Sequence, residues 1–287
     1  NATYTELING TKEFLNGNII GITQSPYLFK KLFLQARRMN FIPLFVSILF
    51  EIRDNYIFIC CDEGRLMRPV LYFEDNGKIN YYRSDTSLLK KMEKNELSWD
   101  EYLYGVNGNI NKNEFLLLDE KIIQNDKYIQ GKSIVEYIDK NEEESAYITH
   151  YADKLNENIK YEYTHCEIHP SMIFGVMGSQ VIFPEHNQLP RNLFSCGQSK
   201  QAVSLYHSNF LNRIDKLGVV LNYGDIPLVK SRMLNYIHEE KHPYGFNTIV
   251  AIMCYNGYNV EDAILINEGS VKRGLFHTTY YNMYEAY

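Results

Sequence analysis

From about residue 161 onward, short apolar runs alternate with turns rich in Gly, Pro and Asn. Runs of this length, bounded by turn residues, are typical of the short strands of a sandwich or a barrel. The runs are, in order, MIFGVMG, QVIFPEHNQLPRN, GVVLNYGDIPLV, NTIVAIMCYNG and EDAILIN. One helix is expected among them, over residues 199–214. This half of the chain is therefore predicted to be a β-rich, barrel-like domain with inserted helices.

The first half of the chain has another pattern, in which an amphipathic helix precedes several strands. Apolar residues recur at helical spacing over residues 26–38, Pro26 suits a first helical turn, and Arg37 and Arg38 suit a last one. The acidic run NEEES (141–145) is interpreted as a solvated surface run. The other expected elements are strands at 41–52, 55–61, 69–74 and INYYR, a helix in 84–104, a loop at 105–113, a strand opening 134–148 and a linker at 149–160.

Charge and cysteine content limit the classes of function. The formal net charge is −6 at pH 7. A protein that held nucleic acid by itself would carry an excess of Lys and Arg. Either nucleic acid is not a ligand, or another chain supplies the positive charge. The five cysteines form no C-x-x-C pair, which fits reduced thiols inside a cell.

The segment HCEIH (165–169) gathers two His, one Cys and one Glu, which are residue types that bind zinc. The spacing is not that of H-E-x-x-H, and Pro170 biases His169 away from helical geometry. We expect no zinc here and interpret the histidines as hydrogen-bonded structural residues. A zinc-binding domain is the alternative, which metal analysis by mass spectrometry would test.

Two segments carry candidate anion-binding groups. In FPEHNQLPRN (183–192), prolines stiffen a polar loop that presents Arg191, whose planar fork matches phosphate oxygens. An ordinary surface arginine is an equal alternative. Lys200 and Gln201 stand at the start of the predicted helix 199–214, and a helix N-terminus favours anions. A solvated lysine is the alternative reading there.

Glu261 and Asp262 are adjacent carboxylates in the motif GYNVED. Neighbours on an extended chain point to opposite faces, so they cannot share one point as an acid–base dyad does. Two carboxylates in a turn can still help to hold Mg²⁺, which takes one or two protein carboxylates together with waters and substrate phosphates. An ordinary polar turn is the alternative, and the motif alone favours it.

Several segments occur together in a recognisable order. They are HPSMIFGVM (169–177), VIFPEHNQLPRN (181–192), SKQAV (199–203), GFNTIVAIMCYNGYNVEDAILIN (245–267) and RGLF (273–276). This series resembles the second-largest, β-type subunit of multisubunit DNA-dependent RNA polymerase in its eukaryotic and large-DNA-virus forms. DEGRLMRP (62–69) and VEYID with EEES (135–145) resemble the external domains of that subunit. The resemblance covers at least residues 26–285.

The resemblance implies a β-rich α+β fold, with an external α/β module followed by part of a hybrid-binding domain that contains a double-psi β-barrel. Residues 1–34 would end a preceding lobe-like or fork-like region, residues 35–155 would form the external domains, and residues 156–287 would begin the hybrid-binding domain. The barrel would be incomplete, and the chain is expected to be an internal fragment of a longer subunit.

The same resemblance implies roles for individual residues in DNA-templated RNA synthesis. Glu261 and Asp262 match a pair near the second, exchangeable Mg²⁺, and the primary Mg²⁺ belongs to the largest subunit. Arg191 matches an arginine that contacts the incoming nucleoside triphosphate. Lys200 and Gln201 match a pair near the RNA–DNA hybrid. The implied partners are the largest and the small polymerase subunits, the DNA template, RNA and nucleotides, with no membrane. The chain alone would be an inactive piece of a nucleotidyltransferase.

Some positions depart from the family pattern. Leu189 replaces the usual Ser before Pro-Arg-Asn, Phe194 replaces a common Tyr, and the segment Ser195-Cys196-Gly197-Gln198 also differs from the cellular pattern. Together with the Asn, Ile and Tyr bias, these changes favour a large DNA virus of the host cytoplasm over a nuclear enzyme. A non-catalytic structural module that docks on the largest subunit is the alternative function. The joint retention of Arg191, Glu261 and Asp262 argues against it.

Overall fold

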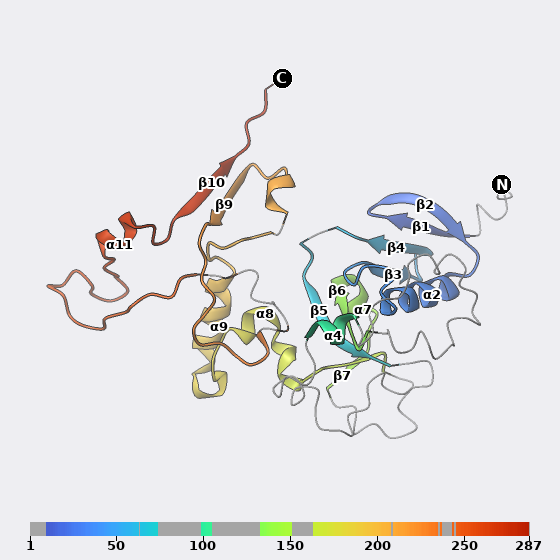
Figure 1. Cartoon of the computed structure of the whole chain (residues 1–287), viewed down its shortest axis with the longest axis horizontal. Helices are drawn as coiled ribbons and strands as arrows, with labels where there is room; N and C mark the ends of the chain where they lie inside the picture. Colours follow the sequence, from blue (N-terminus) through green and yellow to red (C-terminus); the bar gives the residue numbers. More distant parts are fainter. Residues whose placement is uncertain are drawn as a thin grey trace. The chain divides into compact units, whose positions relative to one another are not determined.

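The computed structural model divides the chain into two compact units, Asn1–Ile173 and Phe174–Tyr287. It describes residues 10–62, 64–73, 99–104, 133–150, 163–207, 209–234, 236, 243 and 245–286. Short sheets and helices are interspersed in both units (Figure 1). The predicted α+β, sheet-rich class is confirmed. The double-psi barrel and the domain boundaries at 34/35 and 155/156 stay predictions.

The first sheet of unit 1 has the strand order β2-β1-β4-β3. Its strands are β1 (Thr11–Leu15), β2 (Asn18–Thr23), β3 (Ser47–Glu51) and β4 (Tyr56–Cys60). Strands β1 and β4 are parallel, and the other neighbours are antiparallel. Asn16 and Gly17 both have positive φ, at 47° and 86°, as a tight Asn-Gly hairpin turn requires.

Helix α2 (Pro26–Arg38) contacts β3 and covers the core of this sheet (Figure 1). Ile48, Ile57 and Ile59 form the buried centre. The partly buried residues packed on it include Phe29, Phe33 and Leu34 of α2. Phe29 and Phe33 are four positions apart and so lie on one helical face, and the amphipathic pattern of residues 26–38 explains how the helix docks.

The second sheet of unit 1 has the order β6-β5-β8-β7. Its strands are β5 (Met67–Tyr72), β6 (Val135–Asp139), β7 (Ile148–Thr149) and β8 (His165–Cys166). Every residue of β6 is buried. Helix α4 (Trp99–Tyr104) contacts β6, and helix α7 (Lys140–Glu144) contacts both β6 and β3. Through α7, the two sheets of unit 1 are therefore linked.

Most expectations for unit 1 are confirmed where they can be compared. The helix at 26–38 matches α2 at both ends, and the strands at 55–61 and 69–74 match β4 and β5 within two residues. The strand at 41–52 begins only at Ser47, because turns occupy the residues around Pro43. INYYR and the loop at 105–113 lie outside the described residues, as does most of the linker at 149–160 and of the segment 84–104.

Unit 2 contains short helices and one two-stranded antiparallel sheet in its described residues. The helical segments, with η2 crossing the unit boundary, are η2 (Pro170–Phe174), α8 (Gly175–Ser179), η3 (Pro184–His186), α9 (Leu189–Ser199), η4 (Phe210–Asn212) and α11 (Glu268–Lys272). Strand β9 (Leu217–Leu221) pairs antiparallel with β10 (Thr278–Asn282). The predicted strand in GVVLNYG is thus confirmed.

Several predictions for unit 2 are wrong. QVIFPEHNQLPRN (180–192) contains η3 and the start of α9 and no strand. MIFGVMG is helical, in η2 and α8, and not a strand. A helix was expected at residues 199–214, but the observed helix, α9, occupies residues 189–199 and ends where the expected one would begin. Pro190 suits the first turn of α9. Beyond the helix, the Ser204 carbonyl accepts a hydrogen bond from the Leu221 amide of β9, so this segment is held by the strand. Residues 246–267 contain no assigned strand.

Candidate functional site

Arg191 lies in the first turn of α9, and not in the stiff polar loop that the sequence predicts. Its amide donates to the carbonyl of Gln188 at 3.0 Å. The neighbouring Asn192 side chain donates to the Pro184 carbonyl at 2.9 Å and accepts from Asn187 at 3.1 Å. The turn before the helix is therefore fastened to the helix start, which holds the backbone of Arg191 in place.

The guanidinium of Arg191 is available to an anion. Its carbon lies 6.0 Å from the centroid of the Phe194 ring, one helical turn away, at the limit of a cation–π contact. Among the described residues it has no ion pair or hydrogen bond. The N-terminus of α9 adds the positive end of the helix dipole. A cationic fork on a fixed helical turn is well suited to phosphate oxygens.

Lys200 and Gln201 lie at the other end of the same helix. Lys200 is the C-cap of α9, and the Gln201 amide donates to the Gln198 carbonyl at 3.0 Å. The expectation that a helix N-terminus strengthens anion binding at these residues is therefore wrong. Both side chains are exposed. With a rise of 1.5 Å per residue, the backbones of Arg191 and Lys200 lie about 14 Å apart along α9.

Glu261 and Asp262 occupy the two central positions of a turn, which the Ala263 amide closes by donating to the Val260 carbonyl at 3.2 Å. The φ of Glu261 is 56°, in the left-handed region. The argument from an extended chain, with side chains on opposite faces, therefore does not apply here. Both carboxylates are exposed, and neither has a hydrogen-bond or ion-pair partner among the described residues.

These two carboxylates fit a shared magnesium site. Oxygen ligands suit Mg²⁺, and free, exposed carboxylates can bind it directly or through water. Within the described residues, no group of three or more His, Cys, Asp or Glu could hold a metal ion. A metal at this turn would therefore need ligands from elsewhere. No described hydrogen bond or ion pair joins Arg191 to Glu261 or Asp262.

The HCEIH segment is part of the packing of unit 1. His165 Nε2 lies 2.8 Å from Glu136 Oε1, and its Nδ1 lies 2.8 Å from the Thr164 hydroxyl. His169 Nδ1 lies 2.6 Å from the hydroxyl of Ser171. The interpretation of these histidines as hydrogen-bonded structural residues is confirmed.

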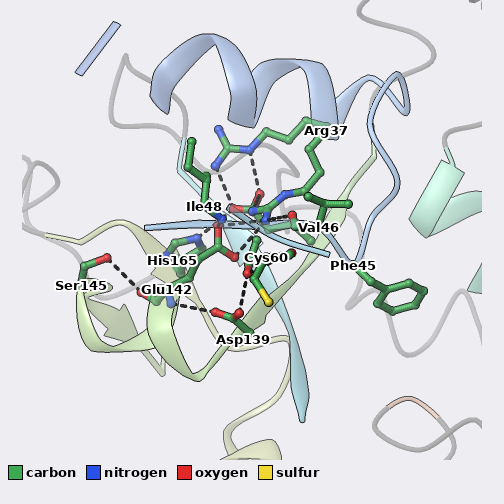
Figure 2. A network of polar contacts seen from close by, with 12 residues as sticks. Arg37, Phe45, Val46, Ile48, Cys60, Asp139, Glu142, Ser145 and His165 are labelled. Atoms are coloured by element: carbon green, nitrogen blue, oxygen red, sulfur yellow. Dashed lines mark hydrogen bonds and ion pairs between the residues drawn. The ribbon is translucent and has the colours of Figure 1, made fainter. Parts of the chain in front are cut away.

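A buried network of charges at the centre of unit 1 was missed by the sequence analysis (Figure 2). Arg37 Nη1 donates to both carboxylate oxygens of Glu142, each at 2.9 Å, and to the Val46 carbonyl at 2.9 Å. Arg37 Nη2 lies 3.2 Å from Glu136, and Arg38 donates to the same carboxylate at 2.8 and 3.0 Å. Arg37 is only 1% exposed.

The interpretation of NEEES as a solvated run is wrong for Glu142, which is 6% exposed. Asp139 caps α7 by accepting from the Glu142 amide at 2.9 Å. The same carboxylate accepts from Ser47 at 2.5 Å and from Arg65 at 2.8 Å. This cap starts a helical turn whose first residues face β3, and Glu142 therefore points inward and accepts from the Ile48 amide at 3.3 Å.

The network shifts the ionisation of its members. Burial alone would raise the pKa of Glu136, but Arg38, His165 and Arg37 outweigh it and hold that pKa well below its ordinary value. Burial raises the pKa of Glu142, which Arg37 only partly offsets. Burial also opposes the charge of Arg37, yet the two glutamates raise its pKa further.

Two signals in the sequence indicate that Arg37 and Glu136 face inward, although they do not identify the partners. Arg37 follows Phe33 by four positions, so it belongs to the inward face of α2 and not to the solvated side. In VEYID, Glu136 interrupts a strand that is otherwise apolar up to Asp139. A charge on the buried face of an element requires a partner, although the pattern does not say which one.

The described residues also bear on the membrane question. None of their helices is both long enough and apolar enough to cross a bilayer.

Comparison with protein-family models identifies three domains in the order of the chain. RNA polymerase Rpb2 domain 4 matches residues 14–74, domain 5 matches residues 127–170, and domain 6 matches residues 177–287. The chain therefore belongs to the Rpb2 family, the second-largest subunits of multisubunit RNA polymerases. The buried network joins residues matched by domain 4, such as Arg37, to residues matched by domain 5, such as Glu142.

Individual relatives agree with this assignment. The chain is 35% identical to DNA-directed RNA polymerase II subunit RPB2 of Encephalitozoon cuniculi, over 98% of this chain and 22% of the relative. It is 34% identical to RNA polymerase II subunit 2 of Arabidopsis thaliana, over 96% of this chain and 21% of the relative. It is 32% identical to DNA-directed RNA polymerase subunit Rpo2 of Sulfolobus acidocaldarius, over 100% of this chain and 22% of the relative. The chain thus spans about a fifth of the length of these relatives.

Proposed function

We propose that this chain is part of the catalytic core of a DNA-directed RNA polymerase. In that role it helps to bind the incoming nucleotide, the second Mg²⁺ and the RNA–DNA hybrid during transcription. The observation that carries the proposal is the turn at 260–263, which exposes Glu261 and Asp262 without described partners. The match to Rpb2 domain 6 spans this turn together with Arg191.

In the proposed reaction, the 3′ hydroxyl of the RNA attacks the α-phosphate of a nucleoside triphosphate. A phosphodiester bond forms, and the bond to the pyrophosphate leaving group breaks. Arg191 binds triphosphate oxygens through its fork and stabilises the negative charge that collects on the leaving group. Glu261 and Asp262 orient water and bias where a cation sits. The Mg²⁺, when bound and shared with the largest subunit, supplies positive charge against the phosphates.

Lys200 and Gln201 are proposed to lie near the RNA–DNA hybrid, where a lysine meets the backbone without reading the sequence. Because the chain carries a net charge of −6, most of the positive charge that holds nucleic acid must come from elsewhere. The proposed partners are accordingly the largest subunit, the small polymerase subunits, the DNA template and RNA. The chain by itself is proposed to be inactive.

An intracellular location, nuclear in a eukaryotic cell, fits this proposal. The named relatives come from a microsporidian, a plant and an archaeon. They give no support to the viral, cytoplasmic source suggested by the composition bias, and we do not propose it.

The test is single-nucleotide addition by the assembled polymerase, measured across a Mg²⁺ titration. We expect the double variant Glu261→Gln/Asp262→Asn to be slower by about 10–100-fold at low Mg²⁺ and to recover in part at high Mg²⁺. The matched control is Glu268→Gln, because Glu268 is exposed nearby and pairs only with Lys272 among described residues, at 2.6 Å. This control should leave the rate unchanged.

One observation favours the alternative of a non-catalytic module. Residues 249–266 expose many large apolar side chains, such as Ile249, Ile252 and Ile264. An apolar stretch of this kind is typical of a surface that another segment or subunit covers. If the double variant keeps the wild-type rate and Mg²⁺ dependence, the carboxylates form a polar turn only, and the chain is a docking module.

A further inference from the structure

Two tight turns follow one another around the carboxylate pair. In the first, the Tyr258 amide donates to the Tyr255 carbonyl at 3.0 Å. Its central residues, Asn256 and Gly257, have φ of 48° and 77°, as an Asn-Gly turn with two left-handed residues requires. The second is the turn at 260–263, with Glu261 in its own left-handed position. Only Asn259 lies between Tyr258, the last residue of the first turn, and Val260, the first residue of the second.

The side chain of Asn259 closes the first of these turns. Its Nδ2 donates to the Met253 carbonyl at 2.5 Å, and its Oδ1 accepts from the Tyr255 amide at 3.0 Å. Both ends of one amide are thus used on the main chain that enters the turn. A carboxamide is the group that can do this, because it carries a donor and an acceptor side by side.

The surrounding backbone gives this segment little other support. Residues 246–267 contain no assigned strand or helix. Most of their side chains are exposed, whereas Asn259 is half-buried. Upstream, the side chain of Asn247 ties the segment to the Ile226 carbonyl at 2.8 Å, but that tie lies before Met253. The path from Met253 to Glu261 therefore depends on hydrogen bonds within the turns, and Asn259 makes two of them.

We propose that Asn259 is a positioning residue, which holds the Glu261–Asp262 turn in the orientation needed for nucleotide addition. The inference rests on the proposed function of that turn. Asn259 itself touches neither substrate nor metal; it acts through the main chain between Met253 and Tyr255. Losing either half of the amide lets the carboxylates sample positions away from the reacting groups, and small displacements of this kind cost rate steeply.

The test uses the assembled polymerase with the full-length subunit. Asn259→Asp keeps the acceptor but loses the donor to the Met253 carbonyl. Asn259→Gln keeps the amide and displaces it by one methylene, and it serves as the second variant if the first assembles poorly. Rates are measured per assembled enzyme, with the Mg²⁺ concentration for half-maximal rate determined separately from the KM for the nucleotide.

The matched control is Asn256→Asp. It adds the same charge in the same loop at a position where both Asn and Asp tolerate a left-handed φ, and no side-chain hydrogen bond of Asn256 is among those described. We expect both Asn259 variants to need about tenfold more Mg²⁺ for half-maximal rate, with the rate largely recovered at high Mg²⁺, and the control to behave as wild type.

The outcomes separate this inference from the proposed function. If the Asn259 variants match the control while Glu261→Gln/Asp262→Asn slows the enzyme, Asn259 has no positioning role and the proposed function stands. If the carboxylate variant also matches wild type, the proposed function fails and takes the inference with it. A loss of rate in the Asn259 variants that high Mg²⁺ does not restore would mean general damage to the loop and would overturn the positioning role.

Discussion

Replacing Arg37 by Met should expose the energetic weight of the buried network in unit 1. Met has a similar length and no charge, so the variant removes the guanidinium with little change in volume. Glu136 would keep Arg38 and His165 as partners. Of the described hydrogen bonds to the Glu142 carboxylate, only the one from the Ile48 amide, at 3.3 Å, would remain. The damage is therefore concentrated at Glu142.

The magnitude follows from leaving one charge of a buried pair behind. Removing a single partner of such a pair costs about 3–5 kcal/mol, a large part of the 5–15 kcal/mol that stabilises a typical domain. Glu142 can limit this cost by taking up a proton, because burial without the guanidinium raises its pKa further. The loss of stability should accordingly be smaller at about pH 5 than at about pH 7.

The second variant is Arg37→Met/Glu142→Leu, which removes both charges. Replacing a buried ion pair by apolar residues of similar volume is often close to neutral. The double variant should therefore be more stable than Arg37→Met alone, with a coupling energy of about 2–3 kcal/mol. Arg53→Met is the matched control, since Arg53 is exposed in the β3–β4 turn, and it should change stability by less than about 0.5 kcal/mol.

The assay is urea denaturation of the 287-residue chain followed by tryptophan fluorescence at low concentration. The chain has one tryptophan, Trp99, and it lies in α4 against β6, so its signal reports on unit 1. The reasoning is refuted if Arg37→Met costs less than about 1 kcal/mol. It is also refuted if the double variant loses the sum of the two single losses, because the two charges would then be independent.

Two other expectations concern acid and association. Because the pKa of Glu136 is lower in the folded chain than in the unfolded one, its contribution is present above the ordinary glutamate pKa of about 4.3 and is lost as the pH falls through the folded value. Unfolding curves between about pH 6 and pH 3 should show this loss, and Glu136→Gln should flatten it; an unchanged slope would contradict the assignment. Ile249 and Ile252 are fully exposed, at 103% and 99%, so the isolated chain should self-associate at micromolar concentration and Ile249→Lys/Ile252→Lys should reduce this. Sedimentation velocity measures the self-association of the wild-type chain and of the Ile249→Lys/Ile252→Lys variant. A monodisperse wild-type chain would contradict the expected self-association.

The order of motifs along the chain was enough to predict the family, because each motif is local and its residues are read directly from the sequence. The mixed, sheet-rich class followed in the same way. Helix α2 was also predictable, since Pro26 and the apolar spacing that define it lie within its own thirteen residues. Strands β4 and β5 are similar cases, because short apolar runs between turn residues carry their own boundaries.

Near Arg191 the local signals were ambiguous. Proline restricts the backbone in a loop and in the first helical turn alike, so Pro190 fitted both a stiff loop and the start of α9. In the structure, the side chain of Asn192 donates to the Pro184 carbonyl and fastens the preceding turn to the start of the helix. The placement of Lys200 at the end of the helix, and not at its start, follows from this one choice.

At the acidic run, by contrast, no local signal could identify which charges would pair with the glutamates. Arg37 and Glu142 are 105 positions apart, and Arg37 and Glu136 are 99 apart. The sequence by itself determined that these residues are charged and that α2 has an inward face. Only the tertiary structure decided that the charges meet there, because an ion pair becomes buried when two sheets close over it, and that closure depends on the packing of both sheets at once.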